Sequence, residues 1–168
     1  MKKLNIREIV ILSLLISIAA VLSYIESAIG LVLPIPYAKI GLTNIAIVFA
    51  LYTLGWQYAI VVSGARLLLT FLMFPNAFAL LYSILGAVIS LSGMILVKKV
   101  NVFSTVGVSV VGGILHNIGQ IIAACLVMQT LGIATYLVPL TVAGTIAGVL
   151  IGIVCGILVN RISKYIKL

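Results

Sequence analysis

Acidic residues are nearly absent from this sequence of 168 residues. It contains no aspartate, its only acids are Glu8 and Glu26, and 7% of its residues are charged, against about 25% in average globular proteins. Without aspartate, the chain lacks the clustered carboxylates that hold Mg²⁺ on a diphosphate leaving group. It also lacks the GxxxxGK[ST] motif of ATP-hydrolysing proteins. We therefore expect the chain not to be an enzyme.

Residues that usually bind metals are also few. His116 is the only histidine, and Cys125 and Cys155 fit neither a CxxC motif nor a disulfide framework. We interpret both cysteines as small core residues. Because no second histidine or nearby carboxylate completes a ligand set around His116, the sequence predicts no metal site and no cofactor.

Long apolar runs dominate the sequence, which is 64% hydrophobic. So few polar side chains cannot cover a water-exposed surface, and the expected solvent is a lipid bilayer. Apolar segments lie at residues 9–33, 40–54, 58–73, 77–97, 103–128 and 136–159. A bilayer core needs roughly 20 helical residues, so the second and third segments are short, and one re-entrant hairpin is the alternative for them. We predict an all-α protein with one domain over residues 1–168, a bundle of six transmembrane helices.

The positive charges predict how this bundle is oriented. The net charge is +8, but the cations lie in short clusters between apolar runs, and we expect no nucleic-acid partner. With six crossings and both termini cytoplasmic, the segments inside hold eight of the ten cations: Lys2, Lys3, Arg7, Lys98, Lys99, Arg161, Lys164 and Lys167. The first apolar run is longer than the core of a signal peptide, so we expect no cleavage there.

Several polar side chains lie within or beside the predicted spans, where ionisable groups are costly. In the predicted topology, all of them lie either in the outer half of the membrane or near its middle. These residues are Glu26, Lys39, Asn44, Arg66, His116, Asn117 and Gln120. We predict that they line a pocket open to the outside. The charges of Lys39 and Arg66 favour an anionic ligand with a carboxylate or phosphate. The alternative is that these side chains hold helices together, with Arg66 paired to Glu26.

Two patterns of small residues predict close approach of helices. Glycine recurs every four residues in the last span, at Gly144, Gly148, Gly152 and Gly156. Such a stripe lets two helix backbones approach closely, either inside this chain or against a partner subunit. Ser13 and Ser17 form a similar, weaker pattern in the first span.

The stretches PYAKIGLTNI at residues 36–45 and GGILHNIGQ at residues 112–120 resemble the bacterial family named heptaprenyl diphosphate synthase component I, also called the Gx transporter family. That family resembles the S components of energy-coupling factor (ECF) transporters, six-helix proteins that capture vitamins or their precursors from outside. The resemblance implies a T subunit and two ATPase subunits as partners, with Ser13 and Ser17 at the positions of an Ala-x-x-x-Ala docking face. It also implies a substrate site that includes Lys39, Asn44, His116, Asn117 and Gln120.

We therefore expect a substrate-binding subunit of an ECF-type uptake transporter in a bacterial plasma membrane. Its ligand would be a small, anionic organic solute, such as a vitamin or a precursor of an isoprenoid or quinone. The alternative is a non-catalytic accessory subunit of a polyprenyl diphosphate synthase, whose basic cytoplasmic face recruits the catalytic partner. A third hypothesis is a stand-alone carrier driven by an ion gradient, with Glu26 or His116 as its proton site.

Overall fold

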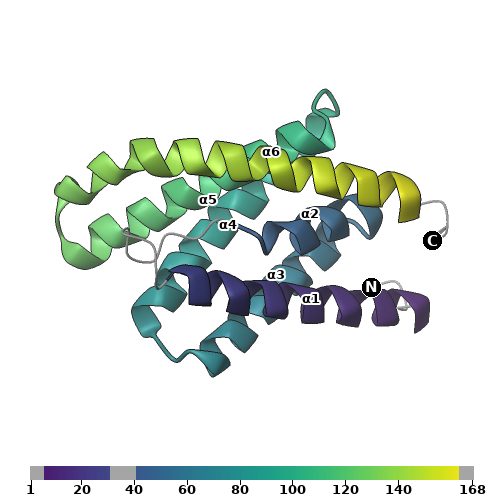
Figure 1. Ribbon diagram of the computed structural model, residues 1–168, viewed down its shortest axis with the longest axis horizontal. Coiled ribbons are helices and arrows are strands. Elements are labelled where there is room, and N and C mark those ends of the chain that lie inside the picture. Colours follow the sequence, from purple (N-terminus) through teal and green to yellow (C-terminus); the bar gives the residue numbers. More distant parts are fainter. Residues whose placement is uncertain (1–5, 31–40, 163–168) are drawn as a thin grey trace.

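The computed structural model describes residues 6–30 and 41–162, with side chains described for residues 6–26 and 41–162. This part of the chain consists of helices joined by short turns and contains no strand (Figure 1). Its elements are α1 (Ile6–Gly30), α2 (Asn44–Thr53), α3 (Trp56–Met73), α4 (Ala77–Val100), α5 (Thr105–Met128), the 3-10 helix η1 (Leu131–Tyr136) and α6 (Leu137–Ile162). The prediction of an all-α bundle is confirmed.

Five of these helices, α1, α3, α4, α5 and α6, are long and apolar enough to cross a membrane. Their outward faces carry large apolar side chains, such as Leu72, which is 75% exposed, and Leu126 and Val138, which are similarly exposed. Lipid tails can cover such faces without the free-energy cost that water would impose. The chain is therefore a multi-pass membrane protein.

The helix α2 differs from the others in length and surroundings. Its ten residues span about 15 Å, half the thickness of a bilayer core. It packs against α1, α3, α5 and α6, and seven of its residues are buried. It begins at Asn44, four residues after the start of the predicted apolar segment. Of the two short segments, α3 is long enough to cross the membrane, whereas α2 is a helix of the bundle core.

Glycines determine how closely α5 approaches its two neighbours. A Cβ atom added to Gly148 of α6 would lie 2.7 Å from the backbone Cα of Val110 in α5. A Cβ atom on Gly119 of α5 would lie 2.7 Å from the carbonyl oxygen of Leu85 in α4. Gly144 and Gly152 also face α5, while Gly156 has more room. The glycine stripe of α6 thus packs inside this chain.

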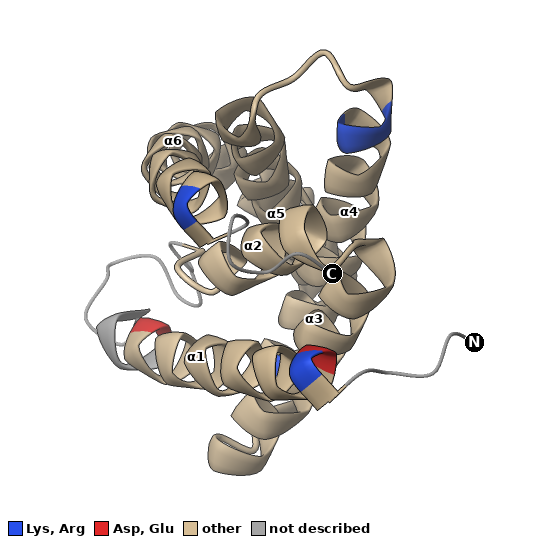
Figure 2. Ribbon diagram, turned by 90° about the vertical axis from the view of Figure 1, so that its right-hand side faces the viewer, with Lys and Arg blue, Asp and Glu red and all other residues tan. Residues whose placement is uncertain are grey.

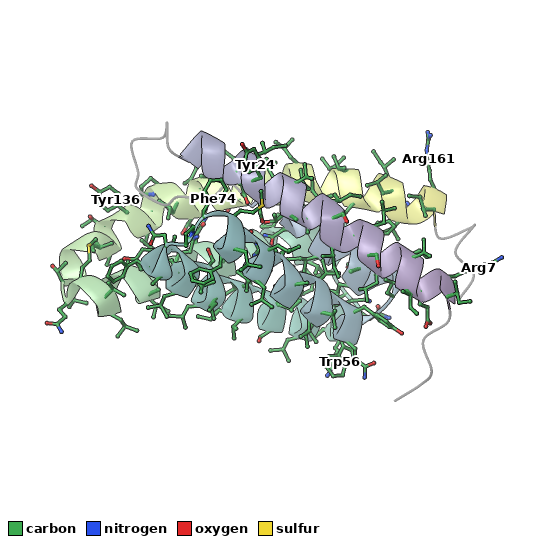
Figure 3. All side chains as sticks on the ribbon, turned by 90° about the horizontal axis from the view of Figure 1, so that it is seen from below. Arg7, Tyr24, Trp56, Phe74, Tyr136 and Arg161 are labelled. Atoms are coloured by element: carbon green, nitrogen blue, oxygen red, sulfur yellow. The ribbon has the colours of Figure 1, made fainter. Side chains whose placement is uncertain are left out.

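Basic residues gather at one end of the bundle. Arg7 and Arg161 lie at this end, and Tyr136 lies at the opposite end (Figure 3). A view onto this end shows basic positions of α1, α4 and α6 there (Figure 2). The side chain of Lys98, in the last turn of α4, donates to the carbonyl oxygen of Leu51 near the end of α2, with a distance of 2.5 Å. We call this end the basic end.

Candidate functional site

The carboxylate of Glu26, in the neighbouring helix α1, binds the turn that immediately precedes α2. It accepts hydrogen bonds from the backbone N–H groups of Gly41 and Leu42, the latter at 2.8 Å, and from the hydroxyl of Thr43 at 3.2 Å. These three residues immediately precede α2. The N–H groups of Gly41 and Leu42 lie in the turn before α2, where a buried carboxylate satisfies them in place of water. The first N–H groups of α2 itself, at Asn44 and Ile45, bond to the carbonyl oxygens of Gly41 and Leu42. The negative charge of the Glu26 carboxylate also interacts favourably with the positive end of the helix dipole.

Thr43 connects this carboxylate to Arg66, which lies near the middle of α3. The Nη1 group of Arg66 donates to the hydroxyl oxygen of Thr43 at 3.0 Å. Thr43 therefore accepts a hydrogen bond from the cation and donates one to the carboxylate of Glu26. Arg66 and Glu26 are each only 2% exposed. The structure thus brings together the two charged residues that the sequence placed in the membrane, with a threonine between them.

Two other donors of Arg66 are buried and have no hydrogen-bond partner within residues 6–30 and 41–162. They are the Nε and Nη2 groups of its guanidinium. The hydroxyl of Thr70 bonds instead to the backbone carbonyl of Arg66, at 2.8 Å. A buried donor without a partner costs about 1–3 kcal/mol, and more when it is charged. These two groups therefore form an incomplete polar site in the middle of the bundle.

The polar residues of α5 face its neighbours α4 and α6. The imidazole of His116 packs against α4 at Gly86, where a Cβ atom would lie 2.9 Å from its Cε1 atom. The side-chain amide of Asn117 donates to the carbonyl oxygen of Leu140 in α6 at 2.6 Å. Asn117 thereby joins α5 to α6. Both amide atoms of Gln120, one turn further along α5, are buried without a hydrogen-bond partner in the described part of the chain.

The remaining predicted site residues are Asn44, Lys39, Ser13 and Ser17. Asn44 is buried as the first residue of α2, directly after Thr43. Lys39 lies outside the described residues. Ser13 and Ser17 lie on the exposed face of α1, where the hydroxyl of Ser17 donates to the carbonyl oxygen of Ser13 at 2.9 Å. The candidate residues thus form two groups, one around the start of α2 and one on α5.

Sequence reasoning missed Thr43, the residue that connects the two charges. The only signal for it was its place beside Asn44 in the stretch PYAKIGLTNI. The groups that the described candidate residues can offer to a ligand are a cation with two open donors, a neutral amide and an imidazole. Within residues 6–30 and 41–162, no three His, Cys, Asp or Glu side chains are grouped in a way that could hold a metal ion.

A family model described as heptaprenyl diphosphate synthase component I matches residues 15–158. This range includes all the candidate residues except Ser13. No curated protein and no solved structure matches the chain.

Proposed function

The chain belongs to the family of heptaprenyl diphosphate synthase component I, and on this premise we propose that it is a membrane-embedded subunit that binds a small, anionic organic solute. The family name describes one component of a synthase. Prenyl transfer needs carboxylates that hold Mg²⁺ on the diphosphate. This chain has no aspartate, and the carboxylate of Glu26 is already bonded to the turn before α2. A non-catalytic role agrees with both facts.

The observation that carries this proposal is the buried guanidinium of Arg66 with two unpartnered donors. A charge at this depth costs roughly 2.5–3.5 kcal/mol by insertion scales. A residue needed only to pack helices together would not require a charge. The unpartnered amide of Gln120 adds a neutral group that both donates and accepts hydrogen bonds. We propose that an anionic solute extends from Arg66 in α3 to Gln120 in α5 and hydrogen-bonds both residues.

We further propose that binding occurs from outside a bacterial plasma membrane. If the basic end faces the cytoplasm, as positive residues generally do, then Glu26 lies in the outer half of the membrane. Arg66 follows Trp56, the first residue of α3, by ten positions, or about 15 Å, which places it near mid-depth. A vitamin or a precursor of an isoprenoid or quinone would be suitable in size and charge.

For energy, we propose an ECF module made of a T subunit and two ATPases, because this chain has no ATP-binding motif. The exposed Ser13 and Ser17 on α1 are the proposed docking face. Affinity purification from the native membrane should recover these subunits with the wild-type protein and less of them with Ser13→Leu/Ser17→Leu. Equal recovery with both proteins would contradict this docking face.

Solute binding is tested by mass spectrometry of small molecules that copurify with the detergent-solubilised protein. We expect one organic anion with the wild-type protein, reduced about tenfold or more in Arg66→Gln, because one charge-assisted contact is lost. Arg161→Gln, an exposed arginine in α6, is the matched control and should retain the wild-type amount. If the folded wild-type protein carries no anion and takes up none from a cell extract, the proposed function is wrong.

A second candidate function is an accessory subunit of a polyprenyl diphosphate synthase, which the family name favours. In this case the basic end would recruit a catalytic subunit. Purified alone with Mg²⁺ and allylic and homoallylic diphosphates, the chain should show no elongation. Stable copurification with a prenyl synthase, together with higher activity of that enzyme, would favour this candidate over the transporter subunit.

A further inference from the structure

We propose that the group bound at Arg66 is a singly charged oxyanion, held side-on by the Nε–H and Nη2–H groups of the guanidinium. This inference depends on the proposed function, because it names the ligand chemistry of the same site. A carboxylate of a free solute and the phosphodiester of an anionic lipid headgroup share this chemistry.

The arrangement of the open donors supports two-point binding. In an arginine side chain, Nε–H and the nearer N–H of Nη2 lie on one edge and point in the same direction. Their spacing matches the two oxygens of a carboxylate or phosphate. Nη1 lies on the other side and is already bonded to Thr43. The two unpartnered groups of Arg66 are therefore the two halves of one complete edge.

The remaining contacts hold this edge in place. The hydroxyl of Thr43 fixes Nη1, and Glu26 fixes Thr43. The carboxylate of Glu26 is already occupied by Gly41, Leu42 and Thr43. We therefore assign Glu26 and Thr43 as positioning residues that act through Arg66, and Arg66 as the residue that contacts the ligand.

The local charges favour a ligand group with one negative charge. Among the described residues around the start of α2, Arg66 contributes +1 and Glu26 contributes −1, and the N-terminus of α2 adds roughly half a positive charge. A dianion would add more negative charge than these described groups balance at low dielectric constant. A carboxylate or phosphodiester, with one charge spread over two oxygens, is the better match.

The test is an NMR titration of the proposed donor itself. The chain contains three arginines, Arg7, Arg66 and Arg161, so a protein labelled with ¹⁵N-arginine gives three Nε–H signals. Arg7→Lys and Arg161→Lys identify two of these signals, and Arg66 is assigned without changing the site. Both substituted residues are exposed, so these variants should fold normally.

Sodium acetate is the carboxylate probe, acetamide its uncharged analogue, and sodium chloride the control for ionic strength. We expect acetate to shift the Arg66 signal with saturation and to slow its exchange with water, while acetamide and chloride do not. If the group comes from lipid, phosphatidylglycerol produces this shift and acetate does not. Either pattern supports the oxyanion edge, and the two patterns identify its source.

No shift with either acetate or phosphatidylglycerol would overturn the inference, as would an equal shift with acetamide. If a solute copurifies equally with wild-type protein and Arg66→Lys, solute binding stands but the oxyanion edge is wrong. Absence of any solute from both proteins would instead count against the proposed function.

Thr43 provides a second test that does not remove the charge. Thr43→Val should weaken binding of the effective probe about tenfold, because the guanidinium loses its anchor, and Thr43→Ser should restore most of the affinity. Thr53→Val is the matched control, because within the described residues the Thr53 hydroxyl bonds inside α2, to the carbonyl oxygen of Phe49. Loss of binding in Thr43→Ser equal to that in Thr43→Val would refute the positioning role.

Discussion

Glu26→Gln is expected to destabilise the protein strongly, although the two side chains have nearly the same shape. The wild-type carboxylate accepts bonds from Gly41, Leu42 and Thr43. A glutamine can keep the two backbone bonds only as neutral ones, at a loss of about 1 kcal/mol each. Its amide nitrogen cannot accept from the Thr43 hydroxyl. Loss of the favourable charge at the start of α2 adds ~0.3–1 kcal/mol.

Arg66 makes the expected effect of this substitution larger. Its positive charge is buried, and Glu26 is the acidic group connected to it through Thr43. Together with the lost bonds, we expect a total loss of about 3–5 kcal/mol. For a chain of this length, that corresponds to a melting temperature lower by roughly 10 °C.

The assay is thermal unfolding in a mild detergent, with Glu8→Gln as the matched control. Glu8 is also buried, but it lies at the start of α1, eighteen residues before Glu26. The decisive variant is the pair Glu26→Gln/Arg66→Met. Because the pair no longer buries an uncompensated charge, it should be more stable than Glu26→Gln alone. A melting temperature of Glu26→Gln within about 2 °C of wild type, or purely additive effects in the pair, would refute this reasoning.

Three further predictions test packing, binding and orientation. Gly148→Val should lower the melting temperature, because its side chain would meet the backbone of α5, whereas Gly156→Ala, whose nearest contact is 4.0 Å away, should not. Gln120→Leu should weaken solute binding without loss of stability, because it removes a buried amide that has no partner in the described part of the chain. Asn117→Ala should instead cost about 1 kcal/mol of stability, because it removes the hydrogen bond to Leu140. Melting curves and the amount of copurified solute, measured on the same preparations, distinguish the two effects. Single cysteines introduced near Lys98 should be labelled only from the cytoplasmic side, and those near Pro75 and Thr135 only from outside; labelling of the C-terminus from outside would contradict the topology.

The helices could be predicted because each apolar run ends at a local signal. Gly55 separates α2 from α3 with a φ of +107°, and Asn76 caps α4 after Pro75 by accepting from the backbone N–H of Ala79. Both signals are in the sequence itself. The start of α2 was less predictable, because hydropathy alone extends this segment back to Ile40. The turn before its actual start is bonded to Glu26, which lies in a different helix.

The sequence predicts only those residues of the candidate site whose placement in lipid has a high free-energy cost. Arg66 and Glu26 could be predicted as site residues because charged side chains are rare within membrane spans. Thr43 could not, since a threonine near a helix start is ordinary, and its role depends on two partners distant in sequence. The hydrogen bond from Asn117 to the carbonyl oxygen of Leu140 could not be predicted either, because every residue has a backbone carbonyl and the sequence does not show which one is used.

The short helix α2 also has a consequence for how the protein is synthesised. Ten residues are too few for a segment to enter the bilayer as an independent span, and without Glu26 the N–H groups of Gly41 and Leu42 before it would lack partners there. The long helices α4, α5 and α6 can each partition into lipid as they leave the ribosome. We expect α2 to remain outside the lipid until α1 is in place and presents Glu26 to its N-terminus. The order of insertion is therefore constrained by one carboxylate, and a chain without it should accumulate as a membrane intermediate with α2 still undocked.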